Sequence, residues 1–280
     1  MRTVWINGEW FLENEARVSV FDRGLLFAQS VYEVVPVIDG RLCNMGYHLA
    51  RLTNSLKTAR IADDTDWPAV FAEAVAANGV HEGRVYLQVT GGSAGDRDFL
   101  SPASPIAPTR IVFTQSGAVI DHPQARTGLR IALKPDARWT LRSAKTSQLL
   151  YAVLMKEQAR DAGIDDAWLV EDGHITEGTS SNAHIIDTHG ALVSHPVDHG
   201  VLPGVTRICV LDIARGMGIT VEERPFTPDE LYAAREAFSS AASALVLPVV
   251  EVGGRPVGDG RPGAITTAIR AAYVERLRSA

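Results

Sequence analysis

Hydrophobic and polar residues alternate in short runs along the first third of the chain, which predicts strands joined by tight turns. The opening runs predict a hairpin, because Asn7-Gly8 suits the positive φ angles of a two-residue turn. Further on, Leu49, Leu52 and Leu56 recur at the spacing of one helix face. The strands expected in this part are 4–6, 9–12, 31–38, 84–90 and 110–115, and the helices are 47–60 and 66–77.

The second half carries a similar mixture of patterns. A helix is expected to close at Gly163, and two hairpins should turn at Asp172-Gly173 and His189-Gly190. The strands expected here are 129–133, 167–170, 174–176, 184–186, 191–193, 220–223 and 245–252, and the helices are 147–162, 206–217 and 265–277. The whole pattern predicts an α+β protein with an N-terminal domain at 1–117, a linker at 118–127 and a C-terminal domain at 128–280.

Composition narrows the function classes. The 280 residues are 46% hydrophobic and 21% charged, with a net charge of −6, which gives no electrostatic footprint for nucleic acid or for a membrane surface. No apolar run reaches the length of a membrane span, so a cytoplasmic protein that acts on small molecules is expected. Cys43 and Cys209 lie far apart without a ligand pattern, which predicts buried thiols and neither a disulfide framework nor a metal site.

Lysine is scarce, with four residues against 23 arginines, so the search for a lysine that forms a Schiff base is short. Lys57 and Lys156 lie on expected helices, and Lys134 ends a strand, positions that suit solvent exposure. Lys145 lies in RWTLRSAKTSQLL between a strand and a helix, where functional side chains are often presented. Composition alone favours a surface lysine even there, so the assignment depends on other motifs.

Two downstream segments combine glycine with hydroxyl side chains. EGTSSN (177–182) places Glu177 in a turn, and LPGVTR (202–207) places Thr206 at the start of a helix. Each segment has an ordinary interpretation, a hydroxyl-rich turn for the first and a helix N-cap for the second. A helix N-terminus that follows glycine is also suited to phosphate, because its free N–H groups and the helix dipole point the same way.

Six segments together resemble a known family. DRGLLFAQSVYEVV, HLARL, RWTLRSAKTSQLL, ITEGTSSN, LPGVTR and AFSSAASALVLPVVEV occur in the order and spacing of fold type IV pyridoxal-5′-phosphate (PLP) enzymes, over nearly the whole chain. The likeness is greatest to bacterial D-amino acid transaminases. It implies a smaller N-terminal α/β domain, a larger C-terminal PLP-binding domain with a β-barrel-like core, and a homodimer whose active site borrows a loop from the partner subunit.

The resemblance also implies roles for individual residues. Lys145 would carry PLP as an internal aldimine and shuttle the proton between Cα and C4′ of the substrate adduct. Glu177 would bind the pyridine nitrogen, where a carboxylate favours the protonated, electron-withdrawing ring. Leu202 would pack on the ring face, and Arg138 would lie near the ring hydroxyl. The implied phosphate contacts are Arg51, Val205, Thr206, Ala241 and Ala242.

Some of these residues have plain alternatives. An arginine on an amphipathic helix, such as Arg51, is more often a solvated cation or an ion-pair partner, although a planar guanidinium suits bidentate phosphate binding. Tyr32 alternates with its neighbours on a strand and reads as a half-buried aromatic residue, whereas the resemblance places it against the substrate carboxylate.

The loop TGGSAGDRDFLSP departs from the family's pattern. D-amino acid transaminases usually hold the substrate carboxylate with an Arg-x-His pair. Arg97 stands at the arginine position here, but Phe99 or Asp98 replaces the histidine, and Gly91 occupies a position that is often arginine. We expect Arg97 to bind the carboxylate; the alternative is a solvated loop residue paired with Asp96 or Asp98.

The expected activity is transfer of an amino group from a D-amino acid such as D-alanine to a 2-oxo acid. Three alternatives use the same cofactor: an (R)-selective amine transaminase, a branched-chain L-amino acid transaminase and, less favoured, an aminodeoxychorismate lyase. A non-catalytic homologue is disfavoured because Lys145, Glu177 and Thr206 are all present. The motifs shared by these enzymes cannot separate them, so discrimination falls to the Arg97 loop and to Tyr32.

Overall fold

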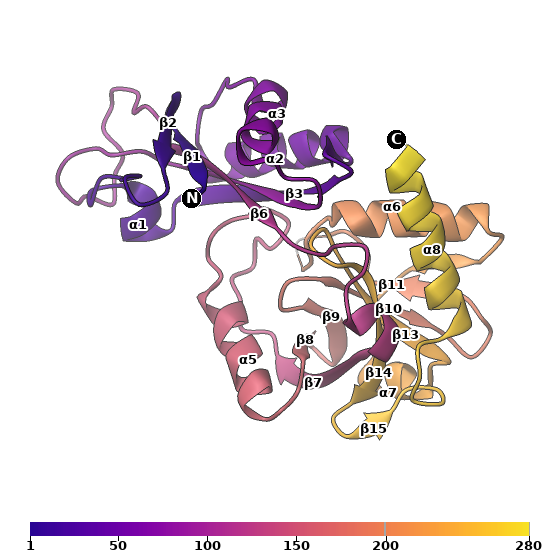
Figure 1. The fold of residues 1–280 in the computed structure, drawn as a ribbon. Coiled ribbons are helices and arrows are strands. Elements are labelled where there is room, and N and C mark those ends of the chain that lie inside the picture. The colour runs from indigo at the N-terminus through magenta and orange to yellow at the C-terminus, as the bar shows by residue number, and fades with distance from the viewer. Residues whose placement is uncertain (199, 280) are drawn as a thin grey trace. The chain divides into compact units, whose positions relative to one another are not determined.

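A computed structural model describes residues 1–198 and 200–279, and the chain divides into two compact units (Figure 1). Unit 1 consists of Met1–Ala118 and Ala144–Gln148, and unit 2 of Val119–Ser143 and Leu149–Ala280. The chain therefore returns to unit 1 for five residues in the middle of unit 2. Nothing in the local sequence pattern predicted this return, which involves the segment that carries Lys145.

Unit 1 is built on one antiparallel sheet. Its strands are β1 (Thr3–Ile6), β2 (Glu9–Leu12), β3 (Ser30–Ile38), β4 (Arg41–Leu42), β5 (Gly83–Thr90) and β6 (Arg110–Ser116), in the order β2-β1-β6-β5-β3-β4. The predicted hairpin is confirmed, with φ angles of 52° at Asn7 and 102° at Gly8 in the turn. The other strands expected in this part also form, within one residue of the predicted bounds.

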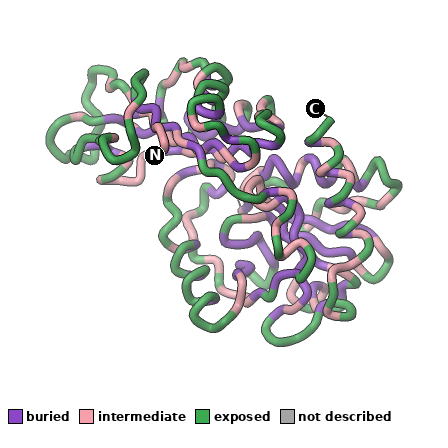
Figure 2. Tube along the Cα trace, in the orientation of Figure 1, coloured by how far each residue is buried: buried purple, intermediate pink, exposed green. Residues whose placement is uncertain are grey.

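The helices of unit 1 are α1 (Arg23–Phe27), α2 (Met45–Ala59) and α3 (Trp67–Asn78). Both α2 and α3 pack on the sheet, where Leu52, Phe71 and Val35 belong to one buried core. Figure 2 shows this burial along the strands and along the inner sides of the helices. The leucine spacing therefore identified the correct face of α2. Helix α1 was not predicted, because at five residues it is too short to show a helical period.

Unit 2 contains a closed ring of strands. Its strands are β7 (Leu129–Pro135), β8 (Asp166–Glu171), β9 (His174–Gly178), β10 (Asn182–Ile186), β11 (Leu192–Ser194), β12 (Val221–Glu223), β13 (Glu236–Ala241), β14 (Leu245–Val252) and β15 (Arg255–Pro256). Six of them follow the path β10-β13-β14-β7-β8-β9, and the pairing of Asn182 with Glu177 joins β9 back to β10. The expected barrel-like core of an α+β fold type IV enzyme is confirmed.

Helices surround this ring. They are α4 (Gln124–Thr127), α5 (Leu150–Asp161), α6 (Val205–Gly216), α7 (Pro228–Ala233) and α8 (Ala264–Ser279). In Figure 1, α6 and α8 lie together against β13 and β14, while α5 lies beside β7 and β8. Helix α5 begins at Leu150, three residues later than the sequence predicts, because the residues before it belong to unit 1.

Cys43 and Cys209 are both buried thiols, as predicted. Within residues 1–198 and 200–279, no helix combines the length and the apolar character that a membrane crossing requires. The cytoplasmic location stays a prediction of the sequence.

Candidate active site

The segment that carries Lys145 is bound to the edge of β3. The backbone N–H of Tyr32 donates to the Lys145 carbonyl at 3.0 Å, and the N–H of Ser147 donates to the Ser30 carbonyl at 3.2 Å. On its other side, the Lys145 N–H donates to the Ser55 hydroxyl of α2 at 3.0 Å. These bonds fix the main chain of residues 145–147 and so fix the position from which the lysine side chain extends.

Lys145 differs from the other three lysines in its surroundings. Its side chain is half-buried and its Nζ lies 4.3 Å from the centre of the Tyr32 ring. Lys57 and Lys156 are exposed on helices, as predicted, whereas the expected exposure of Lys134 is wrong, because this residue is half-buried in β7. Lys145 is thus the lysine whose amine faces a predicted substrate residue.

Tyr32 lies on the opposite face of β3 from the buried core of unit 1. It is half-buried, whereas its neighbours Val31 and Glu33 are buried. Its ring stacks on Tyr86 with centroids 5.7 Å apart. The stacking holds the Tyr32 ring beside the Lys145 amine.

Arg51 of α2 is buried against a carboxylate. Its Nε and Nη2 donate to the two oxygens of Glu33 at 2.8 and 2.7 Å, and His48 Nδ1 lies 2.8 Å from the same carboxylate. Burial alone would raise the pKa of Glu33, but the charge and hydrogen bonds of Arg51 and His48 outweigh it and lower the pKa to about 2. A phosphate would have to share Arg51 with this ion pair, and the phosphate role stays a prediction.

Arg97 lies on an exposed loop of unit 1. Its guanidinium carbon is 5.0 Å from the ring centres of both Phe27 and Phe99. Arg23 holds the loop by donating to the main-chain carbonyls of Asp98 and Phe99 at 2.8 and 3.0 Å. No ion pair among the described residues joins Arg97 to Asp98 or to Asp96. The aromatic rings, and not an acidic neighbour, orient this arginine.

Glu177 closes the barrel of unit 2 and is almost fully buried. Its Oε1 accepts from Arg138 Nη1 at 2.6 Å, and its Oε2 accepts from Asn182 Nδ2 and the Leu202 N–H at 3.0 and 3.1 Å. Burial raises the pKa of Glu177, and Arg138 and the hydrogen bonds offset this only in part. Because each carboxylate oxygen has two lone pairs, Oε1 retains room for one more donor.

Asn182 connects the predicted ring-binding and phosphate-binding parts of unit 2. Besides Glu177, its amide donates to the Leu202 carbonyl at 2.9 Å. A Cβ at Gly204 would lie 1.9 Å from Asn182 Oδ1, so only glycine lets the start of α6 approach this closely. Asn182 ends the motif ITEGTSSN, and no feature of the sequence predicted a role for it.

The start of α6 presents main-chain N–H groups. Its first intrahelical bond runs from the Ile208 N–H to the Gly204 carbonyl, and Gly204 provides no side-chain cap. The first-turn amides of Val205 and Thr206 therefore have no acceptor within the helix. Both residues are buried. This geometry fits the predicted phosphate contact.

Strand register brings the last predicted segment to the same place. Asn182 of β10 is paired with Ser240 of β13, and Ala241 and Ala242 follow directly at the end of that strand. Six of the seven predicted residues of unit 2 thus come together around Asn182. They are Glu177, Leu202, Val205, Thr206, Ala241 and Ala242.

Arg138, the seventh, joins this group through Glu177. Its Nη2 also donates to Asp136 at 2.7 Å, so its guanidinium lies between two carboxylates. Asp136 is a second residue that the sequence did not single out. Its carboxylate is fully buried and also accepts from Arg142 and Thr176.

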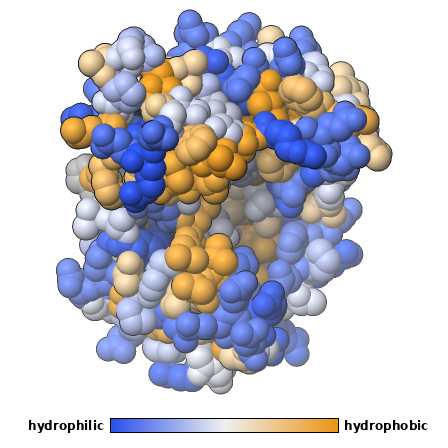
Figure 3. All heavy atoms as spheres, turned by 90° about the vertical axis from the view of Figure 1, so that its left-hand side faces the viewer, coloured by the Kyte–Doolittle hydropathy of each residue, from blue (hydrophilic) through white to orange (hydrophobic). Residues whose placement is uncertain are grey.

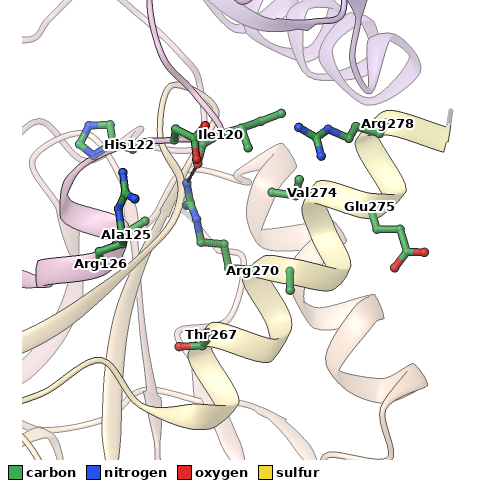
Figure 4. A pocket seen from close by; sticks show the side chains of 11 residues that line it. Ile120, His122, Ala125, Arg126, Thr267, Arg270, Val274, Glu275 and Arg278 are labelled. Atoms are coloured by element: carbon green, nitrogen blue, oxygen red, sulfur yellow. Dashed lines mark hydrogen bonds between the residues drawn. The ribbon is translucent and has the colours of Figure 1, made fainter.

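A cavity of about 500 Å³ in unit 2 lies between α8 and residues 120–126 (Figure 4). In that view Arg270 extends from α8 and donates to the Ile120 carbonyl at 2.7 Å. The same guanidinium also donates to the carbonyls of Val119, Ala244 and Val246, so it serves as a structural brace. None of the predicted site residues lines this cavity, and it is not part of the candidate active site.

Comparison with known proteins decides the family. The family model described as amino-transferase class IV matches residues 30–252. The chain belongs to the class IV aminotransferases. The chain is also 32% identical over 281 residues to the D-alanine aminotransferase of Bacillus licheniformis, covering 99% of this chain and 97% of that protein. A D-alanine aminotransferase of Staphylococcus haemolyticus is 32% identical over 286 residues, covering 100% and 99%.

Solved structures of this aminotransferase family agree with the fold. The branched-chain amino acid aminotransferase of Escherichia coli matches with a TM-score of 0.89 and 25% identity, over 99% of this chain and 94% of that one. A T.th. branched-chain enzyme, solved with pyridoxamine 5′-phosphate, matches with a TM-score of 0.89, 26% identity and the same coverage. The predicted family, fold and enzyme class are therefore confirmed, and the aminotransferase uses PLP with an amino donor and a 2-oxo acid.

The residues of unit 2 fit both ends of PLP, the pyridine nitrogen and the phosphate. The acidic group at Glu177 suits a protonated pyridine nitrogen, and the uncapped start of α6 suits a phosphate dianion. Asn182 holds these two elements together, and the missing Cβ at Gly204 lets the start of α6 pack closely against Asn182.

Proposed function

We propose that this aminotransferase moves an amino group from a D-amino acid such as D-alanine to a 2-oxo acid. The observation that carries the proposal is 32% identity to D-alanine aminotransferases over 99–100% of the chain. The alignment spans the chain almost from end to end, so it extends across the Arg97 loop, although that loop departs from the usual Arg-x-His pattern.

For the cofactor, we assign the pyridine nitrogen to Glu177 Oε1, which has lone-pair capacity left beside Arg138. The main-chain N–H of Leu202 donates to the same carboxylate. This position suits a contact between Leu202 and the ring face. The phosphate is assigned to the amides of Val205 and Thr206 and the Thr206 hydroxyl. Ala241, Ala242 and Arg51 complete the assigned phosphate contacts, and Arg138 is assigned to the ring hydroxyl.

Lys145 is assigned as the lysine that binds PLP covalently and then moves the substrate proton. When bound, PLP withdraws electrons from the amino acid and so acidifies its Cα–H bond. The Lys145 amine would accept this proton as a general base and then deliver it as a general acid. Its main chain is fixed by Tyr32 and Ser55, so the amine reaches from a rigid support.

Tyr32 and Arg97 are assigned to the substrate. The Tyr32 ring lies beside the Lys145 amine. Because Lys145 is assigned to bind PLP, this position places the Tyr32 hydroxyl close to the reacting substrate. Arg97 supplies a planar cation suited to a carboxylate, and Phe27 and Phe99 orient it. A carboxylate that loses water on binding needs such a partner.

A homodimer is part of the proposal. Several apolar side chains of unit 1 are exposed, and exposed apolar surface does not stabilise a monomer. The exposed fractions are 67% for Val20, 45% for Phe21, 68% for Leu25, 75% for Phe99 and 78% for Leu100. Figure 3 shows apolar side chains gathered on the face of the molecule drawn there. A second copy of the chain that covers these residues would also place Arg97 at a subunit boundary.

The main alternative is a branched-chain L-amino acid aminotransferase, because solved enzymes of that kind share the fold at 25–26% identity. An (R)-selective amine transaminase would need no carboxylate contact. The deciding experiment follows conversion of PLP absorbance to the pyridoxamine form with D-alanine, L-leucine and (R)-1-phenylethylamine in parallel. D-alanine is expected to react fastest; faster conversion with L-leucine or the amine would replace the proposal with the matching alternative.

A further inference from the structure

Asp136 follows β7 and gathers two arginines around a carboxylate with no solvent exposure. Its Oδ2 accepts from Arg138 Nη2 at 2.7 Å, from Arg142 Nη1 at 2.8 Å and from the Thr176 hydroxyl at 2.7 Å. Its Oδ1 accepts from Arg138 Nε at 2.9 Å. Asp136 thus holds the Nε–Nη2 edge of the Arg138 guanidinium as a bidentate fork.

The other terminal nitrogen of Arg138 reaches Glu177. Nη1 donates to Glu177 Oε1 at 2.6 Å, so two carboxylates share one guanidinium. Arg142 is shared in the same way, since its Nη2 donates to Glu171 at 2.6 Å. The connected charges are three carboxylates and two guanidiniums, with Asp136 at the centre.

This arrangement changes how strongly Arg138 acts on Glu177. A guanidinium beside a carboxylate favours its ionised form and makes it a weaker base. Because Asp136 neutralises much of the Arg138 charge, Glu177 is affected less than by an unshared arginine. The direction agrees with the raised pKa of Glu177, for which burial is the largest cause and Asp136 adds in the same sense.

We propose that Asp136 is a positioning residue that orients Arg138 and shares its charge, so that Glu177 stays basic enough to keep a proton on the pyridine nitrogen of PLP. The inference rests on the proposed function, in which Glu177 binds that nitrogen. Asp136 itself acts through Arg138 and contacts neither cofactor nor substrate in this assignment.

The test measures the ring proton directly. The holoenzyme is loaded with PLP labelled with ¹⁵N in the ring, and the ¹⁵N chemical shift, which differs between protonated and neutral pyridine, is followed against pH. Asp136→Asn should lower the pH at which the ring loses its proton by about one unit, a tenfold change in proton affinity. Arg142→Gln, which removes a cation from the other side of Asp136, should raise it.

Thr176→Val is the matched control, because it removes one hydrogen bond from Asp136 and no charge. It should leave the ring titration unchanged. Glu177→Gln is the reference for loss of the ring partner, and circular dichroism checks the fold of each variant. If Asp136→Asn does not bind PLP, Arg142→Gln decides alone.

The outcomes distinguish a failure of the Glu177 assignment from a failure of the inference about Asp136. If Glu177→Gln leaves the titration unchanged, Glu177 is not the ring partner and the assignment under the proposed function is wrong. If Glu177→Gln shifts it but Arg142→Gln does not raise it, the inference about Asp136 is overturned while the proposed function stands. Opposite shifts in Asp136→Asn and Arg142→Gln support the inference, since a purely structural defect would not change sign with charge.

Discussion

The Lys145 amine lies 4.3 Å from the centre of the Tyr32 ring, and the main chains of the same two residues are hydrogen bonded. Lysine and tyrosine are therefore placed by one piece of backbone, residues 145–147 on the edge of β3. Moving the main chain of either residue away from the other would break the hydrogen bonds along this strand edge.

The first prediction is that Lys145→Ala abolishes covalent PLP binding and turnover, because among the described residues Lys145 is the lysine whose amine lies against Tyr32, a predicted substrate residue. Borohydride reduction of the parent enzyme followed by peptide mapping should label Lys145. Lys57→Ala, an exposed lysine of the same unit, is the control and should retain both properties. Labelling of Lys57, Lys134 or Lys156 in the parent would contradict the assignment.

The second prediction is that Glu177→Gln keeps PLP but slows removal of the Cα proton at least about tenfold, or 1.4 kcal/mol in the barrier. The neutral amide preserves contacts to Asn182 or Leu202 but no longer favours a protonated ring. Cofactor content is measured by absorbance and the proton-removal rate by stopped flow with deuterated and undeuterated D-alanine. An unchanged rate would show that Glu177 has no part in electron withdrawal.

Local pattern predicted much of the fold, and the reasons are visible in particular elements. The turn at Asn7-Gly8 and the leucine face of α2 are decided by neighbours in sequence, so they could be read without the structure. Strand β13 was missed because EAFSSA has little of the β-branched and aromatic content that marks strands. Only its pairing with β10 and β14 makes it a strand.

Only the site residues that lie within family motifs could be predicted from the sequence. Glu177 and Thr206 lie in recognisable segments, but the contacts that Asp136 makes with Arg142 and Thr176 depend on the barrel. The pairing of Lys145 with β3 spans more than a hundred residues of sequence and leaves no periodic signal. Long-range pairing of this kind is a property of the folded chain and not of any window within it.

The third prediction concerns acid stability. The pKa of Glu33 is about 2 in the folded chain, below its ordinary value near 4.5, so its contribution is complete above pH 4.5 and is lost as the pH falls towards 2. The contribution at pH 7 is on the order of 3 kcal/mol. Glu33→Gln should lower the free energy of unfolding at pH 7 by about 3 to 5 kcal/mol, because the buried Arg51 loses the carboxylate charge beside it.

Urea unfolding at pH 7, 4.5 and 3 measures this effect. The difference between parent and Glu33→Gln should shrink as the pH falls. Glu13→Gln, which breaks the exposed ion pair with Arg2, is the control and should change stability little at any pH. A difference that stays constant from pH 7 to pH 3 would show that the charge of Glu33 does not stabilise the fold.

The fourth prediction addresses the dimer. Leu25 is 68% exposed in α1, and Leu25→Asp should weaken self-association, because burial of one leucine contributes about 1.5 to 3 kcal/mol. The dissociation constant should rise roughly tenfold to a hundredfold. Sedimentation velocity across a dilution series measures it, and Met217→Asp, at another exposed apolar residue, is the control. A parent enzyme that sediments as a monomer would refute the dimer itself.

The arrangement around Arg97 leads to the last prediction. In the usual Arg-x-His pair the histidine adds a second donor, whereas Phe99 can only hold the Arg97 guanidinium in place. Phe27 holds it from another side, and Arg23 fixes the loop. A single oriented arginine should therefore carry the contact that family members divide between two residues.

Arg97→Ala should lower kcat/KM for D-alanine at least about thirtyfold, mainly through KM, because loss of a desolvated charge pair costs roughly 2 to 5 kcal/mol. An (R)-1-phenylethylamine half-reaction should change little, since that amine has no carboxylate. Arg97→Lys keeps the charge without the planar fork and should fall between the parent and Arg97→Ala, while Arg17→Ala, at an exposed arginine of the same unit, is the control. Equal effects on both substrates, or none on either, would place carboxylate recognition elsewhere.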